Sequence, residues 1–299
     1  MKAYSPHERL VAAARPTKAL ILTITGFAAI EFLYQLGRDL LDYVLENLSP
    51  DVAAVVFEGV APVAVLYDLY SFGILGVLVV WVGWRNHDRG FLTLFGTLEL
   101  GIKDLRLAVI GAGGMHLILL GIIPWGFEYA EMGRLDHWLI LLPFGLLALL
   151  VQTGAEELFY RGYLQQQLAA RYRQTWVWMV VPNVAFASVH WFNGTDSLDS
   201  VYYVFWAFAF GLAASDLTAR SGTLGAAIGF HLVNNAFAFM LLDTAGRPGS
   251  GLALFLYPAQ EEPGKVLPVT DGVIMGLHLG VDLSVILVAW LAVRVAIRR

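Results

Sequence analysis

The chain contains no cysteine, and only 14% of its 299 residues are charged. The absence of cysteine excludes disulfides and thiolate metal sites. Soluble domains carry about 25% charged residues, so this chain has too few charges to cover a surface that faces water on all sides. The formal net charge is −5 and no basic run interrupts the sequence, which argues against nucleic acid as a partner.

Apolar residues make up 58% of the sequence, against about 45–50% in ordinary soluble domains. A helix needs roughly 20 predominantly apolar residues to cross the hydrocarbon core of a bilayer. Stretches of this kind occupy approximately residues 18–37, 62–84, 105–127, 137–168, 176–194, 201–219, 223–242 and 273–296. We therefore predict an all-α fold, a polytopic membrane helical bundle of about eight transmembrane helices. It forms a single membrane domain over residues 1–299.

The distribution of basic residues predicts the orientation of the bundle. Most of the 19 Lys and Arg residues fall in the N-terminal segment, in alternate loops and in the C-terminal tail, while the other loops carry acids. The positive-inside rule then places both termini in the cytoplasm, in a plasma or inner membrane. The first apolar run also fits a signal peptide, but it is long and no clean small-residue cleavage site follows it.

Charged and polar residues that are costly inside lipid concentrate in three of the predicted helices. A charge at the bilayer centre costs about 2.5–3.5 kcal/mol on insertion scales, so it needs a partner, a cavity or a function. These residues are Glu156, Glu157 and Arg161 in the fourth helix, His190 in the fifth, and His231 and Asn235 in the seventh. Structural ion pairs and hydrogen-bonded core histidines are the alternative interpretation of such residues.

The spacing within the fourth and seventh helices predicts which side chains meet. Glu157 and Arg161 are four residues apart, so they lie on one helical face and can form an ion pair. Glu156 points about 100° away from Glu157 and is free for another contact. His231 and Asn235 are also four residues apart and can address one point.

The positions of these residues along their helices predict a common depth. Glu156 lies 17 residues before Arg173, near the middle of a predicted loop, and His190 lies 17 residues after it. Two antiparallel helices joined at this loop bring Glu156 and His190 to the same level. At 1.5 Å per residue, His231 lies about 17 Å from the basic residue Arg220. The three helices therefore converge at one level, reached from the cytoplasm.

Residues of these types suit the hydrolysis of a bond inside a membrane. A carboxylate and an imidazole together can hold a water molecule and remove its proton. A developing oxyanion needs donors that are already in place, and a His and an Asn side chain can supply them. Arg161 would keep Glu157 ionised next to Glu156, because two unpaired adjacent carboxylates cannot both stay charged.

The three motifs, Glu156-Glu157…Arg161, Phe186…His190 and His231…Asn235, resemble those of the CPBP family of intramembrane proteases. That family includes type II CAAX prenyl endopeptidases and proteins that process bacteriocins or confer immunity to them. The resemblance covers about residues 140–242, a third of the chain, and places a catalytic core at 137–242. It implies a glutamic-type endopeptidase acting on a membrane-embedded, lipidated or precursor substrate at the bilayer.

The resemblance also implies roles for the individual residues. Glu156 would be the general base and His190 would help to position the water, while His231 and Asn235 would stabilise the oxyanion. Glu157, Arg161 and Phe186 would support them. Members have also been described as zinc proteases, for which Glu156, His190 and His231 would be the ligands. We expect no required cofactor, because two His four residues apart on one helix, the usual zinc signature, are absent.

Two other functions use the same residues. A transporter could use the buried carboxylates as a proton relay, but such folds often contain inverted repeats and none is found here. A catalytically idle immunity protein would not need Glu156, His190, His231 and Asn235 all intact. The sequence therefore favours the protease.

Overall fold

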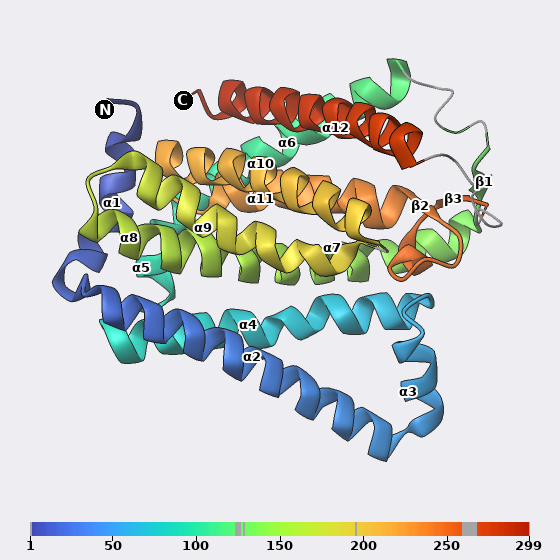
Figure 1. The fold of residues 1–299 in the computed structure, drawn as a ribbon, viewed down its shortest axis with the longest axis horizontal. Helices are drawn as coiled ribbons and strands as arrows, with labels where there is room; N and C mark the ends of the chain where they lie inside the picture. Colours follow the sequence, from blue (N-terminus) through green and yellow to red (C-terminus); the bar gives the residue numbers. More distant parts are fainter. Residues whose placement is uncertain (1, 123–126, 128, 195, 259–267, 299) are drawn as a thin grey trace.

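A computed structural model, shown in Figure 1, describes residues 2–122, 127, 129–194, 196–258 and 268–298. The main helices are α1 (Glu8–Val11), α2 (Leu20–Leu48), α3 (Pro50–Phe57), α4 (Pro62–His87), α5 (Phe91–Phe95), α6 (Leu98–Ile122), α7 (Leu135–Glu157), α8 (Gln165–Arg171), α9 (Thr175–Val189), α10 (Ser197–Ser221), α11 (Gly225–Ala236) and α12 (Pro268–Ile297). Two π-helical stretches interrupt this pattern: Leu158–Leu164 joins α7 to α8, and Phe237–Leu241 extends α11.

A small sheet lies at one end of the helical bundle. Its strands are β1 (Glu131–Met132), β2 (Leu242–Thr244) and β3 (Phe255–Tyr257). The strand order is β1-β3-β2, and the central strand β3 runs antiparallel to β1 and parallel to β2. In the register, Leu256 faces Glu131 on one side and Asp243 on the other. The sheet connects the loop before α7 to the chain that follows α11.

The all-α polytopic bundle predicted from the apolar runs is confirmed. Among the described residues, six helical segments are long and apolar enough to cross a membrane. They are α2, α4, α6, the continuous α7–α8 rod, α10 and α12. The predicted spans at 176–194 and 223–242 fall on two shorter helices, α9 and α11, so a count of eight complete crossings stays a prediction. Residues 123–126, at the predicted end of the third span, lie outside the described residues.

The length of one helix differs from the prediction for a physical reason. Helix α2 continues to Leu48, beyond the predicted end at residue 37. Within this extension Arg38 pairs with Asp68 of α4 at 2.7 Å. Helix α11 continues through its π-helical stretch, so the helix over Gly225–Leu241 agrees with the predicted span at 223–242. Nine of the twelve α11 residues are buried inside the bundle.

Local sequence signals explain where α10 begins and ends. The side chain of Asp196 accepts hydrogen bonds from the backbone N–H groups of Leu198 and Asp199, at 2.8 and 2.9 Å. This is the usual N-cap arrangement, which satisfies donors that have no partner within the helix. The helix stops at Gly222, whose φ of +70° is a left-handed conformation that glycine adopts without strain. Helix α11 then starts three residues later.

Both chain termini lie at the same end of the bundle, at the left of Figure 1, and the sheet and α3 lie at the opposite end. We call these the terminal end and the distal end. Helices α2 and α4 form one side of the molecule, and α6 and α12 form the other, with α7 to α11 between them (Figure 1). The shared end agrees with both termini lying on one side of the membrane, and the cytoplasmic assignment stays a prediction.

Candidate active site

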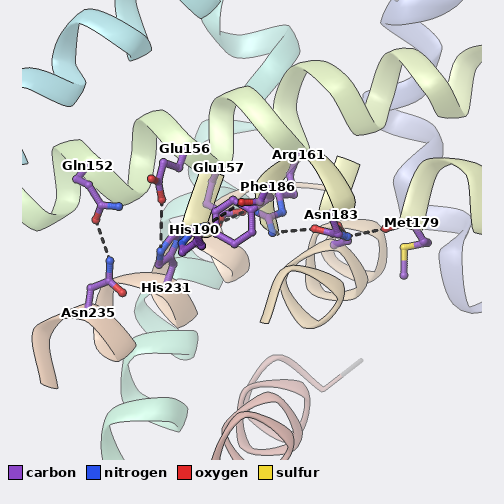
Figure 2. Close-up of polar contacts among 11 residues, drawn as sticks. Gln152, Glu156, Glu157, Arg161, Met179, Asn183, Phe186, His190, His231 and Asn235 are labelled. Atoms are coloured by element: carbon purple, nitrogen blue, oxygen red, sulfur yellow. Dashed lines mark hydrogen bonds and ion pairs between the residues drawn. The ribbon is translucent and has the colours of Figure 1, made fainter. Parts of the chain in front are cut away.

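The fourth predicted span places Glu156 and Glu157 at the end of α7, just before the π-helical stretch. π-Helical turns often occur at functional sites. The side chains of Glu157 and Arg161 are completely buried, and Arg161 Nη1 donates to Glu157 Oε1 at 3.0 Å. The ion pair expected from the spacing of these two residues is therefore present. In Figure 2 this pair lies between the contact of Glu156 with His231 and the side chain of Asn183.

His231 of α11 joins both carboxylates. Its Nδ1 lies 2.8 Å from Glu157 Oε1, and its Nε2 lies 3.6 Å from Glu156 Oε2. An ionised carboxylate only accepts hydrogen bonds, so Nδ1 carries a proton and Nε2 is the nitrogen that faces Glu156. Glu157 therefore does more than pair with Arg161, because it also orients the His231 ring. This second contact was not expected from the sequence.

The second residue of the α11 motif contacts a side chain that the sequence motifs did not include. Asn235 Nδ2 donates to Gln152 Oε1 at 2.9 Å (Figure 2). Gln152 lies one helical turn before Glu156, on the same face of α7. Its spacing of four residues from Glu156 was the signal available in the sequence. His231 and Asn235 thus contact successive levels of α7.

A second residue absent from the motifs, Asn183 of α9, extends the network away from the carboxylates. Arg161 Nη2 donates to Asn183 Oδ1 at 3.0 Å, and Asn183 Nδ2 donates to Ser215 Oγ at 2.8 Å. Gly211 of α10 leaves the space for this contact, because a Cβ atom there would clash with the Asn183 amide. A buried amide in an otherwise apolar span was the only sequence signal for Asn183.

The α9 motif places its aromatic residue at the centre of the group. Phe186 is completely buried, and the Arg161 guanidinium lies over its ring, 4.5 Å from the centroid. The Phe186 carbonyl accepts from His190 Nδ1 at 2.8 Å, so the other ring nitrogen of His190 is left as an acceptor. His190 lies at the end of α9, beside His231 (Figure 2), and both rings pack against Phe186, at 4.5 and 6.2 Å between centroids.

The structure thus brings the predicted residues together in one region, but they differ in how many hydrogen bonds they make. Glu156, His231 and Asn235 are each at most 9% exposed. Glu156 Oε2 makes no hydrogen bond to a described side chain, so its lone pairs can accept a proton. Around it lie one imidazole held by a carboxylate and two amide side chains. Such a set can accept a proton, return it and stabilise a negative oxygen.

The alternative zinc site does not fit this arrangement. Among the described residues, no group of three His, Asp or Glu side chains is placed to hold a metal ion. A catalytic zinc site needs three protein ligands that converge on one point about 2 Å from each. Glu156, His190 and His231 are neighbours, but they do not converge in this way. We therefore derive no step of the chemistry through a metal.

One comparison with known protein families matches the segment that contains these residues. Residues 138–237 match the family model described as type II CAAX prenyl endopeptidase Rce1-like. The matched segment contains all three motifs, so the resemblance predicted from them is confirmed for this part of the chain. The chain is thus an integral membrane protein with a protease-like segment, and the match supports an endopeptidase that acts within the membrane.

A curated relative is less informative. The chain is 26% identical over 161 residues to the uncharacterized protein YyaK of Bacillus subtilis (strain 168). The aligned part covers 54% of this chain and 49% of the relative, so the chain spans about half the length of the curated protein it matches. No protein of solved structure matches the chain.

Proposed function

We propose that this protein is an intramembrane endopeptidase in which Glu156 activates the attacking water. The observation that carries the proposal is the buried contact of His231 with both carboxylates, at 2.8 Å from Glu157 and 3.6 Å from Glu156. Arg161 compensates the charge of Glu157, so Glu156 is the carboxylate that remains free to take a proton. A carboxylate in this position is a suitable general base.

The reaction follows from these positions. Glu156 takes one proton from a water molecule that His190 helps to orient, and the water oxygen bonds to the carbonyl carbon of the substrate. His231 donates to the oxyanion that forms through Nε2–H, while its Nδ1–H stays on Glu157, and Asn235 donates through its amide N–H, as preorganised donors do in other peptidases. The peptide C–N bond then breaks, and the proton held by Glu156 passes to the leaving amine. Glu157 and Gln152 hold His231 and Asn235 in place. No metal or other cofactor takes part in this proposal.

An apolar groove supports a substrate that is embedded in the membrane or carries a lipid. The groove has a volume of about 680 Å³ and lies between α4 and α7. Its lining runs from Trp84 and Phe91, at the terminal end, to Ala155 beside Glu156. Its lining residues are all Gly, Ala, Val, Leu, Phe or Trp, and predominantly apolar lining is typical of ligand sites. We propose that the apolar part of the substrate lies here, so that the site opens to the cytoplasmic side of a plasma or inner membrane.

The proposed activity can be tested through its substrates. In a strain that carries Glu156→Gln, we expect full-length forms of one or more membrane proteins to accumulate, because the protease binds them without cutting them. Quantitative proteomics of membranes, with attention to peptides that span cleavage sites, measures this. Glu99→Gln makes the same chemical change at an exposed position and serves as the matched control. Identical membrane proteomes in the two strains would contradict the proposed activity.

Asn235→Ala tests the proposed oxyanion donor. We expect turnover to fall by roughly 10²–10³-fold, which is the usual effect of removing one such donor. Among the described residues, the neighbouring Asn234 donates to Asn235 Oδ1, at 3.1 Å, so Asn234→Ala should cost no more than about tenfold, the worth of one neutral hydrogen bond. Cleavage of a substrate in detergent measures both variants. Equal losses in the two would argue against a direct role for Asn235.

A further inference from the structure

Polar side chains follow one face of α2 from the level of the site to the distal end. Glu31, Tyr34, Gln35, Arg38 and Asp42 recur at spacings of three or four residues, which places them on one side of a helix. Helix α2 is long and apolar enough to cross a membrane. A polar row inside such a helix is costly unless it faces a partner or a water-filled cavity.

A polar pocket lies along this row, between α2 and α4. It has a volume of about 280 Å³, and its lining comprises Tyr34, Gln35, Arg38 and Asp42 of α2 with Asp68 and Phe72 of α4. A water molecule occupies about 30 Å³ in the liquid, so the pocket has room for several. Its walls supply the donors and acceptors that such waters need.

The hydrogen bonds around the pocket run inward from the distal end. Arg38 pairs at 2.7 Å with Asp68, whose side chain is 58% exposed, and it also donates to the buried hydroxyl of Ser71. Tyr34, another lining residue, packs on Phe72 of α4 with 5.8 Å between the ring centroids. Two turns nearer the terminal end, Phe27 of α2 stacks on Phe159, three residues beyond Glu156, at 4.9 Å. The polar groups of the pocket therefore lead from an exposed carboxylate toward the level of the proposed base.

Tyr34, which lines the pocket, and Glu156, the proposed base, lie at the same depth in the bundle. Tyr34 lies 14 residues from the start of α2, and Glu156 lies 15 residues before the end of α8, so both are about 21–23 Å from the terminal ends of their helices. Toward the terminal end, every residue from Ala155 to Leu168 is buried. Among the described residues, the pocket between α2 and α4 is thus a polar route from the level of Glu156 toward the distal end.

We propose that this pocket is the inlet through which the hydrolytic water reaches Glu156, from the distal end of the bundle. The inference rests on the proposed function, because only a hydrolase needs such a supply. Substrate and water would then approach the base from different sides: the substrate along the groove between α4 and α7, and the water between α2 and α4.

Cysteine labelling tests the inlet directly, because the chain has no cysteine of its own. Gln35→Cys places a thiol in the pocket lining. Leu36→Cys is the matched control, since Leu36 is 52% exposed on the surface outside the pocket and lies one residue nearer the distal end. A membrane-impermeant, charged thiol reagent is added on the distal side. We expect the Gln35→Cys protein to react at least about tenfold faster than the Leu36→Cys protein, because the thiolate forms in water and not in an apolar environment.

The same modification tests whether the water in the pocket is used. Attaching the charged group to the Gln35→Cys protein should lower kcat at least about tenfold with little change in KM, because water supply is blocked while the substrate groove stays open. The modified Leu36→Cys protein should keep its kcat.

Three results would each overturn the inlet: equal labelling of the two variants, labelling of the Gln35→Cys protein only from the terminal side, or an unchanged kcat after that protein is completely labelled. Labelling needs no activity and can be repeated in a chain that also carries Glu156→Gln. Absent cleavage by the unmodified protein would refute the proposed function instead, so the two failures are distinguishable.

Discussion

Glu156→Gln is expected to reduce peptide-bond cleavage by roughly 10²–10⁴-fold, the usual contribution of general base catalysis. The substitution keeps the size and polarity of the side chain, but the amide cannot accept a proton from water. Folding should change little, because Glu156 Oε2 makes no hydrogen bond to a described side chain and the ion pair of Glu157 with Arg161 stays intact. Cleavage in detergent, measured beside thermal unfolding, separates these two effects.

The same assay distinguishes the metal-free mechanism from its zinc-dependent alternative. Addition of a strong chelator should leave cleavage by the unmodified protein unchanged if Glu156 acts without a metal. Loss of cleavage on chelation, with recovery on addition of zinc, would favour the metal-dependent protease. Near-normal cleavage by Glu156→Gln would show that the catalytic assignment of Glu156 is wrong.

Arg161→Ala is expected to lower the free energy of unfolding by about 3–5 kcal/mol, together with the rate of cleavage. Removing one partner of a buried ion pair leaves the other charge without compensation. Here the uncompensated group is Glu157, whose side chain is completely buried. The substitution also removes the donor to Asn183 Oδ1 and the cation above the Phe186 ring. Thermal or denaturant unfolding in detergent measures the loss.

Two controls identify the cause of this destabilisation. Arg134 pairs with Asp136 at the surface, where both side chains are more than 60% exposed, so Arg134→Ala should cost less than about 1 kcal/mol. In a chain that already carries Glu157→Gln, Arg161→Ala should cost much less than it does alone, because no carboxylate is left unpaired. An undiminished effect in that background would assign the destabilisation to lost packing and not to charge.

How far the sequence predicts this site depends on the range of each interaction. The pair of Glu157 with Arg161 follows from a spacing of four residues within one helix, and the structure contains it. The contacts of Gln152 with Asn235 and of Arg161 with Asn183 join residues 83 and 22 positions apart. No spacing rule applies between helices whose rotation about their own axes is unknown, so these partners could not be predicted.

The boundaries of the helices also divide into those that the local sequence predicts and those that depend on contacts between helices. Apolar runs predicted where helices lie, because lipid requires every spanning segment to satisfy its backbone hydrogen bonds internally. They did not predict that α2 continues to Leu48, since its polar extension is stabilised by residues of α4. They also did not predict that α11 is enclosed, since burial between neighbouring helices is not visible in its composition.

By itself, the sequence determined that the chain is a helical membrane protein and that its costly polar residues belong to three helices and resemble a protease family. Hydropathy and the period of the α-helix are local properties, and they suffice for the membrane helices and the faces of their polar residues; the resemblance rests on the three motifs themselves. Only the tertiary structure decided that His231 lies between Glu156 and Glu157, that Gln152 and Asn183 complete the network, and that a polar pocket lies between α2 and α4. Each of these depends on how helices far apart in the chain are rotated and packed against one another, which is a property of the whole bundle and of no single segment.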